Sequence, residues 1–281
     1  MDQANIGRQK PSASPSSRLI RRPVRHLRAN LVPDFYDELS PYYHLIYQDW
    51  EASVERQGQQ LTQLIRERWG DETRSILDVA CGIGTQSLGL ASKGFAVTAS
   101  DLSEAAVERA HQEAEARELE IQFSVCDMRN IESHHPAGFD VVLCADNSIP
   151  HLLTDEEICS ALRAMHSRLR PGGGCILTMR DYAKEGRGRG IVKPYGVREV
   201  GEVRYLVWQV WDFEGEQYIV SMYFAEDNME GSEPRTRVMR SRYYAIPIDR
   251  MLMLMEEAGF QSVERLDDVY FQPVLVGAKC A

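Results

Sequence analysis

The chain has 281 residues, of which 43% are hydrophobic and 26% are charged, as expected for a globular protein that can bury a sizeable core. Its formal net charge of -10 argues against nucleic acid or an anionic membrane surface as the partner. No apolar run reaches the roughly 20 residues of a membrane span, and the first residues lack the apolar core of a signal peptide. We therefore expect a cytoplasmic protein that does not bind membranes.

The six cysteines lie mostly inside apolar segments, and none forms a CxxC pair. This usage predicts buried free thiols in a reducing compartment. Nothing in the sequence has metal-ligand spacing, so no metal is expected. The cysteines are Cys81, Cys126, Cys144, Cys159, Cys175 and Cys280.

Residues 1–33 are rich in Pro, Ser and Arg and have no periodicity, which predicts a flexible leader. We expect it to be a solvated tail, although its positive charge leaves contact with an anionic surface open. Its arginines include Arg18, Arg21, Arg22, Arg25 and Arg28. From residue 34 to about residue 70, apolar and aromatic side chains recur at helical spacing, which predicts a helical N-terminal segment.

Strand and helix patterns alternate through the middle of the chain. Thr154 followed by Glu157 is a capping box that marks the start of one helix, and Ser103 can cap another. Such alternation implies a mostly parallel, doubly wound sheet. Strands are predicted at residues 75–80, 96–100, 121–126, 139–144 and 175–179, and helices at 85–92, 103–117 and 154–170.

The rhythm changes after Arg180, where extended segments with alternating apolar residues predict an antiparallel β insertion at about residues 183–247. A helix at 249–258 and strands at 263–266 and 274–278 follow. The expected fold is α/β: residues 34–281 form one domain with a doubly wound, seven-stranded, mostly parallel sheet, an N-terminal helical lid at 34–70 and the β insertion.

The loop after the first strand has the features of a nucleotide-binding turn. Gly82 and Gly84 let the backbone pass close to a ligand, and Ala80 lies beside them at the carboxyl end of the strand, where open parallel sheets bind ligands. The third glycine of a dinucleotide loop is missing, and Asp78 stands inside the strand. Both features favour a cofactor that has no pyrophosphate and carries a cationic amino-acid end.

Acidic residues end the next two strands. Asp101, followed by Leu102, can accept hydrogen bonds from both ribose hydroxyls of an adenosine. Asp127 is placed to reach the adenine amino group, and Met128 to pack on the ring. Each aspartate alone could be a helix cap or turn residue, but three at successive strand ends favour the cofactor site.

This set of residues resembles the class I S-adenosylmethionine-dependent methyltransferases, which have a Rossmann-like fold. The resemblance covers about residues 34–280 in the order of elements, and its specific motifs lie between Leu77 and Tyr182. It implies S-adenosyl-L-methionine as the cofactor, S-adenosyl-L-homocysteine as the product and no metal. Ala145, which follows the fourth strand, would also contact the cofactor.

The following loop carries candidate substrate residues. Asn147 would lie near the transferred methyl group and can accept a hydrogen bond from an amine. Arg180 can clamp a carboxylate with two hydrogen bonds; the alternative is a surface ion pair with Asp181 or another acid. His151 would line the cofactor site or serve as a structural hydrogen-bonding residue.

An Asn-Ser-x-x-His-Leu loop combined with an Arg-x-Tyr strand end, here Arg180 and Tyr182, is similar to the glycine N-methyltransferase group, which includes relatives that act on sarcosine and dimethylglycine. The Val79–Gly82 segment also matches that group. In the group, the Asn contacts the substrate amine and the Arg holds its carboxylate, so these roles would fall on Asn147 and Arg180.

The resemblance also gives roles to the aromatic N-terminal segment, which would close over cofactor and substrate; ordinary helix packing is the alternative. Within it, Tyr43 and Trp50 would contact the cofactor, Tyr47 would act in catalysis and Tyr36 would contact the substrate. Arg56 would meet the cofactor carboxylate. Hydroxyl groups from the insertion would come from Tyr195, Tyr243 and Tyr244.

We therefore predict methyl transfer to a small molecule, with the amine nitrogen of glycine, sarcosine or dimethylglycine as the first choice. O- or C-methylation of a larger natural product is the alternative. A NAD-dependent oxidoreductase and a non-catalytic binding protein are rival classes, disfavoured by the missing third glycine and by the intact cofactor motif. The resemblance leaves a homo-oligomer open.

Overall fold

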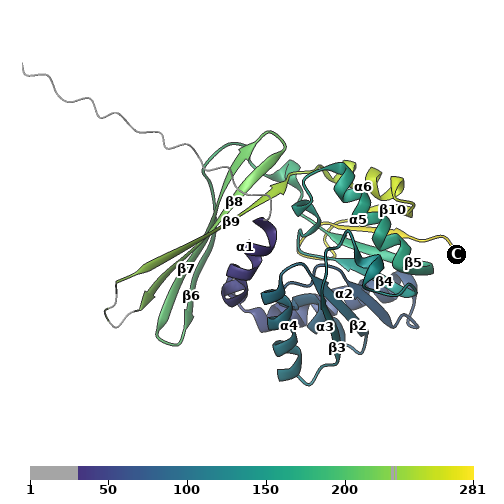
Figure 1. Cartoon of the computed structure of the whole chain (residues 1–281), viewed down its shortest axis with the longest axis horizontal. Coiled ribbons are helices and arrows are strands. Elements are labelled where there is room, and N and C mark those ends of the chain that lie inside the picture. Colours follow the sequence, from purple (N-terminus) through teal and green to yellow (C-terminus); the bar gives the residue numbers. More distant parts are fainter. Residues whose placement is uncertain (1–30, 229–230, 232) are drawn as a thin grey trace, which may run out of the picture.

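The computed structural model describes residues 31–228, 231 and 233–281. The predicted arginine-rich leader, with Arg18 to Arg28, lies outside the described residues. Helix α1 (Leu31–Leu39) begins ahead of the predicted start at residue 34. The chain forms two sheets, and α1 lies between them (Figure 1).

The larger sheet has seven strands in the order β10-β11-β5-β4-β1-β2-β3. All neighbouring pairs are parallel except those of β11, which runs antiparallel to both β5 and β10. The predicted α/β sheet is thereby confirmed. Its strands are β1 (Ser75–Asp78), β2 (Ala96–Asp101), β3 (Ile121–Val125), β4 (Phe139–Cys144), β5 (Leu169–Thr178), β10 (Gln261–Leu266) and β11 (Val274–Ala278).

The strand order reverses at β1, which pairs with β2 on one side and with β4 on the other. Ile76 stands beside Val97 in β2 and Val141 in β4, and all three side chains are buried. Such a reversal opens a crevice at the carboxyl ends of the strands. The register thus places the loop after β1 at this crevice.

Helices cover both faces of the larger sheet. Side chains of α2 and α3 join one apolar cluster with the sheet, and those of α5 and α6 join another, while α4 packs along β2 and β3. The helices are α2 (Trp50–Trp69), α3 (Thr85–Ala91), α4 (Glu104–Ala116), α5 (Asp155–Arg168) and α6 (Ile248–Glu257). Short 3₁₀ turns are η1 (Ser40–Ile46), η2 (Ile131–Ser133), η3 (Ile149–His151) and η4 (Tyr182–Lys184).

Side chains cap α4 and α5 as predicted. Ser103 Oγ accepts a hydrogen bond from the Ala106 N–H at 3.1 Å, and Thr154 Oγ1 accepts one from the Glu157 N–H at 3.2 Å. The Glu157 carboxylate returns to the Leu153 N–H at 3.0 Å, one residue before the position that a capping box uses. Both caps place helix starts next to the crevice.

The second sheet is antiparallel, with four strands in the order β6-β7-β8-β9. Apolar side chains on one face pack against α1 and η1, with Phe35 and Leu45 meeting Val207 and Phe224. The sheet contacts the larger domain in two ways, through the N-terminal helices (Figure 1) and directly, where Tyr218 and Tyr244 join the apolar cluster of α5 and α6. Its strands are β6 (Ile191–Val200), β7 (Val203–Glu214), β8 (Gln217–Asn228) and β9 (Arg235–Tyr244), inside the predicted insertion range.

The cysteines of the described chain are free thiols, and all are buried except Cys280. Within the described residues, no helix is both long and apolar enough to cross a membrane.

Candidate active site

A cavity of about 400 Å³ opens at the carboxyl ends of β1 to β4. It brings together residues that are far apart in the sequence, including many of those predicted for the cofactor. The predicted residues that line it are Tyr36, Tyr43, Tyr47, Ala80, Gly82, Asp101, Leu102, Asp127, Met128, Ala145 and His151.

The loop after β1 forms the floor of this cavity. Gly82 has a φ of 54°, and a Cβ there would stand 3.2 Å from the ring of Tyr43. Its N–H donates to Asp101 Oδ2 at 2.8 Å. Gly84, with a φ of 92°, precedes α3 and is packed against Leu88 and Ala110. Gly84 shapes the turn and does not line the cavity, and its contact with the cofactor stays a prediction.

Asp101 presents a carboxylate to the cavity from the end of β2. Its Oδ1 accepts a hydrogen bond from the Ser103 N–H at 2.9 Å, and its Oδ2 accepts the one from Gly82. Burial raises its pKa, against the opposing effect of these N–H groups. Each oxygen keeps a second lone-pair direction, which fits a pair of ribose hydroxyls.

Asp78 is buried behind the loop and does not line the cavity. Its contact with the cofactor stays a prediction. Its Oδ2 accepts from Ser87 Oγ at 2.7 Å and its Oδ1 from the Ala80 N–H at 3.3 Å. Burial raises its pKa to about 7, although both hydrogen bonds lower it. Asp78 thus connects the loop to α3.

Asp127 is held by an ion-pair network that the sequence did not reveal. Arg129 contacts Asp127 Oδ2 at 2.6 Å and Glu157 Oε1 at 2.6 Å, and both partners line the cavity with it. Burial alone would raise the pKa of Asp127, but the hydrogen bonds and charge of Arg129 lower it overall. A glutamate at the start of a helix and an arginine four residues past a strand are too common to single out from the sequence.

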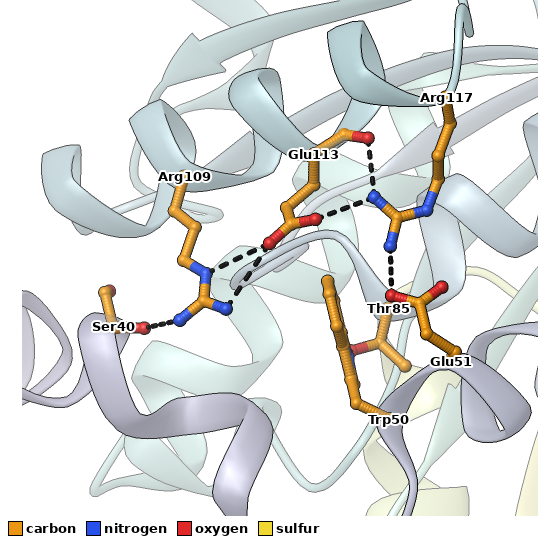
Figure 2. A network of polar contacts seen from close by, with 7 residues as sticks. All are labelled: Ser40, Trp50, Glu51, Thr85, Arg109, Glu113 and Arg117. Atoms are coloured by element: carbon orange, nitrogen blue, oxygen red, sulfur yellow. Dashed lines mark hydrogen bonds and ion pairs between the residues drawn. The ribbon is translucent and has the colours of Figure 1, made fainter. Parts of the chain in front are cut away.

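Trp50 is a packing residue and lies outside the cavity lining. Its Nε1 donates to Thr85 Oγ1 at 2.9 Å, and the guanidinium carbons of Arg109 and Arg117 lie 5.7 and 5.3 Å from its ring centroid. Glu113 joins the two arginines (Figure 2). The ring connects α2 to α4, and its partner Thr85 lines the cavity. The contact of Trp50 with the cofactor stays a prediction.

Arg56 is exposed on α2, and its guanidinium donates to Ser53 Oγ at 3.0 Å. It does not line the cavity, because the face of α2 that turns inward carries its neighbours Gln57 and Gly58. Its contact with the cofactor carboxylate stays a prediction. Among the described lining residues, Arg129 is the only lysine or arginine.

A smaller cavity of about 60 Å³ adjoins the first, and the two share Tyr36, Tyr43 and Asp146 as a common wall. The second sheet supplies much of its lining, through Trp211 and Tyr218 among others. Of the predicted substrate residues, those that line it are Tyr36, Asn147, Arg180 and Tyr195.

Arg180 contributes a positive charge to the smaller cavity. Its guanidinium carbon lies 5.2 Å from the centroid of Trp211, and the Tyr195 hydroxyl is a hydrogen-bonding neighbour. Within the described chain, no carboxylate lies within the 4.0 Å of an ion pair with it. The alternative pairing with Asp181 is excluded, because Asp181 pairs with Arg265 at 2.8 Å.

Asn147 joins the ends of β4 and β5. It has a φ of 62°, and its Oδ1 accepts from the Arg180 N–H at 3.0 Å. Its side chain also bonds the Tyr182 hydroxyl, which reaches Tyr218 at 3.1 Å. Tyr182 itself does not line the smaller cavity, and its contact with the substrate stays a prediction. The amide of Asn147 is engaged in holding Arg180.

In β9, Tyr243 faces the smaller cavity, whereas Tyr244 points the other way and donates to Asp155 Oδ1 at 3.1 Å. Neighbouring residues of a strand face opposite sides, so the two tyrosines cannot both line this cavity; the substrate contact of Tyr244 stays a prediction. Tyr243 lies 3.4 Å from the hydroxyl of Tyr36, which also bonds His151 Nε2 at 2.8 Å. Burial lowers the pKa of His151 to about 3, so its ring is neutral.

Comparison with known proteins identifies the domain. Residues 76–173 match a family of methyltransferase domains. The chain is 32% identical over 161 residues to a glycine/sarcosine N-methyltransferase from Parasynechococcus marenigrum, which is 57% of this chain and 54% of the relative. The chain thus spans about half the length of the curated relatives that it matches.

Two solved structures are similar in fold. A sugar N-methyltransferase from Streptoalloteichus superposes with a TM-score of 0.72 at 20% identity, covering 98% of this chain and 100% of that chain. An amino pentose methyltransferase from Micromonospora echinaspora, solved with S-adenosylmethionine bound, has a TM-score of 0.70 at 18% identity, with 81% and 92% covered. Together these similarities show a Rossmann-like methyltransferase fold, with a methyltransferase domain matched at residues 76–173.

Proposed function

We propose that this protein transfers a methyl group from S-adenosylmethionine to the amine nitrogen of a small acceptor that carries a carboxylate, such as glycine or sarcosine. The observation that carries the proposal is a guanidinium without an ion-pair partner in the described chain, Arg180, in a small cavity that shares a wall with the large one. The curated relatives named glycine/sarcosine N-methyltransferase support the same acceptor class.

The residues of the large cavity fit the cofactor. Asp101 offers carboxylate lone pairs to the ribose hydroxyls, Gly82 leaves room for close approach of a ligand to the backbone, and Met128 offers an apolar surface for the adenine. When bound, S-adenosylmethionine supplies an electrophilic methyl group on a sulfonium centre.

The protein's contribution is binding, alignment and exclusion of water. Arg180 would hold the acceptor carboxylate through paired hydrogen bonds, and Asn147 would keep the backbone of Arg180 in place. Tyr36 and Tyr43 would separate the site from solvent along the shared wall. Holding two reactants in one orientation can supply several kcal/mol of the barrier reduction.

The decisive test is a methyl-transfer assay with labelled cofactor over amino acids, simple amines, amino sugars and phenols. We expect turnover of glycine or sarcosine, with little turnover of amines that lack a carboxylate. Turnover of amino sugars or phenols alone would contradict the proposal and would favour the larger-acceptor alternative.

A single substitution sharpens this test. Arg180→Lys keeps the charge but loses the planar pair of donors, so KM for the amino acid should rise roughly tenfold while the Kd of S-adenosylhomocysteine stays constant. Isothermal titration and steady-state kinetics measure the two quantities. Equal KM values in the variant and the wild type would exclude Arg180 as the carboxylate clamp.

A further inference from the structure

Asp146 is the acidic residue on the wall that the two cavities share, and the sequence-based candidates did not include it. It follows β4 with a φ of 52°, and its backbone N–H donates to Thr178 Oγ1 at 2.7 Å. A left-handed conformation is uncommon outside glycine, and such strain is retained where the surroundings fix it. Asn147, the next residue, is also left-handed, so the turn aims a carboxylate at the junction of the cavities.

Neutral donors hold the Asp146 carboxylate. Its Oδ2 accepts from the Tyr47 hydroxyl at 3.2 Å, and its Oδ1 from Gln272 Nε2 at 3.0 Å. Gln272 is itself oriented by a hydrogen bond from Thr178 Oγ1 at 3.1 Å. These contacts fix the position of the carboxylate, but they leave its negative charge without a paired cation.

The smaller cavity therefore has one negative and one positive group in its lining, Asp146 and Arg180. Each influences the ionisation of the other, yet the two do not form an ion pair within the 4.0 Å limit. A ligand can thus stand between them. A molecule with an ammonium at one end and a carboxylate at the other matches this arrangement of charge.

We propose that Asp146 binds the ammonium group of the acceptor and accepts one proton from it, while Arg180 holds the acceptor carboxylate. This inference rests on the proposed function and names the group that prepares the nucleophile. An aliphatic ammonium has no lone pair and is the main form of such amines at neutral pH. In the proton transfer an N–H bond breaks, its electron pair stays on nitrogen, and an O–H bond forms on the carboxyl group.

The surroundings of Asp146 suit a proton acceptor. Burial raises its pKa, against the lowering effect of Arg180 and of the two hydrogen bonds, so the carboxylate holds a proton more tightly than an exposed one does. Arg180 is the cation that faces Asp146. Burial also raises the pKa of the tyrosines that face Asp146, so these tyrosines stay neutral. These tyrosines are Tyr43, Tyr47, Tyr195 and Tyr270.

The competing role for Asp146 is as a partner of the cationic cofactor in the large cavity. Binding measurements separate the two roles without turnover. Isothermal titration would give the Kd of S-adenosylhomocysteine, and then the Kd of glycine, sarcosine and acetate for the S-adenosylhomocysteine complex. Acetate has the carboxylate but no ammonium, so it reports on Arg180 alone.

For Asp146→Asn we expect a roughly tenfold weaker affinity for glycine and sarcosine, since a charge-assisted contact is lost. Affinities for acetate and for S-adenosylhomocysteine should stay within about twofold. Asp146→Glu, which keeps the carboxylate, should recover part of the amino-acid affinity. Asp212→Asn is the matched control, because Asp212 lies outside both cavities; it should leave all four affinities unchanged.

The pH profile of kcat/KM gives a second readout. In the wild type, kcat/KM should fall at low pH as Asp146 becomes protonated. In Asp146→Asn the inflection caused by Asp146 should disappear, and kcat/KM should instead increase continuously with pH, in proportion to the fraction of free amine in solution.

Two results would overturn the inference alone: an unchanged amino-acid affinity in Asp146→Asn, or an equal loss of S-adenosylhomocysteine affinity. Failure of the wild-type complex to bind or methylate any carboxylate-bearing amine would instead overturn the proposed function. Thermal unfolding of each variant, together with its S-adenosylhomocysteine affinity, shows that the variant is folded.

Discussion

Asp78 shows how one buried side chain can resemble a ligand-binding residue. Its position before the glycine loop predicted a cofactor contact, yet both of its oxygens accept hydrogen bonds from the protein. Sequence spacing placed it correctly near the loop. The spacing could not show that Ser87, in the first turn of α3, would donate a hydrogen bond to the Asp78 carboxylate.

The raised pKa of Asp78 has a consequence for stability. Because the folded chain binds this proton up to a pH of about 7 and the unfolded chain releases it near 4, the contribution of Asp78 to stability is fully present below about pH 4 and is lost as the pH rises toward 7. We expect the free energy of unfolding of the wild type, minus that of Asp78→Asn, to fall between pH 5 and pH 8.

Urea unfolding of the ligand-free proteins at several pH values measures this difference. Asparagine does not titrate, so the difference isolates the carboxyl group. A difference that is independent of pH would show that Asp78 ionises normally.

The predicted residues that line the large cavity share a physical reason. Asp101 ends β2, Asp127 and Ala145 come after β3 and β4, and the carboxyl ends of parallel strands meet at one edge of the sheet. Their place in space follows from their place in the strand. Trp50 and Arg56 lie on a helix, where the rotation about the helix axis decides which side chains face the cavity.

At the scale of elements, that rotation of α2 is fixed by its contact with α3. Gly58 and Gly89 bring the two backbones together: a Cβ on Gly89 would stand 2.6 Å from the Val54 carbonyl oxygen and 2.8 Å from the Cα of Gly58. Two isolated glycines in helical segments gave no signal of this contact. The sequence therefore predicted both helices but not which side chains of α2 turn inward.

The same contact predicts an unusual effect of alanine. Gly→Ala within an exposed helix usually stabilises the protein by up to ~1 kcal/mol. Gly89→Ala should instead destabilise this protein by ~1–3 kcal/mol, because the added Cβ meets backbone atoms and the two helices must move apart. Urea midpoints measure the change. Gly186→Ala is the control, since a Cβ there would meet only Ile191 Cδ1, at 3.7 Å. A stabilised Gly89→Ala would show that the helices are further apart.

Strand β9 separates two adjacent tyrosines that the sequence could not distinguish. A strand alternates its side chains between faces, and a shift of one residue exchanges them; here Tyr218 pairs with Tyr243, and Gln217 with Tyr244. The alternation was visible in the sequence, but the face that meets the cavity depends on how the whole sheet docks on α1.

This register predicts different phenotypes for two matched substitutions. Tyr243→Phe removes a hydroxyl from the smaller cavity and should raise KM for the acceptor severalfold with little change in stability. Tyr244→Phe loses the hydrogen bond to Asp155 and should cost about 1 kcal/mol of stability with an unchanged KM. Steady-state kinetics and urea unfolding of both variants test this prediction. A raised KM in Tyr244→Phe and a lost stability in Tyr243→Phe would indicate that the register of β9 is shifted by one residue.

At the scale of the whole molecule, the site is built from parts that are separate in the chain. The larger sheet supplies the floor of the large cavity, the second sheet supplies much of the smaller one, and α1 lies between them (Figure 1). The order of elements predicted the two sheets. It did not predict their relative placement, which depends on the buried contacts of Phe35, Leu39 and Leu45.

Because Val32, Pro33 and Tyr36 of α1 line the large cavity, cofactor binding should stabilise this helix. We expect S-adenosylhomocysteine to slow amide hydrogen exchange in α1, while α6, which lines neither cavity, keeps its rate. Mass-spectrometric exchange with and without S-adenosylhomocysteine measures both segments. Equal protection of α1 in the two states would indicate that the helix does not respond to the ligand.

Tyr36, Tyr43 and Asp146 face both cavities, so the two binding equilibria are not independent. A ligand that binds in one cavity orders these side chains. A ligand that then binds in the other cavity loses less conformational entropy, because the side chains are already ordered. Thermodynamic reciprocity then requires that the cofactor change the affinity for the acceptor by the same factor as the acceptor changes the affinity for the cofactor. From this shared wall we expect the cofactor and the proposed acceptor to bind with positive cooperativity.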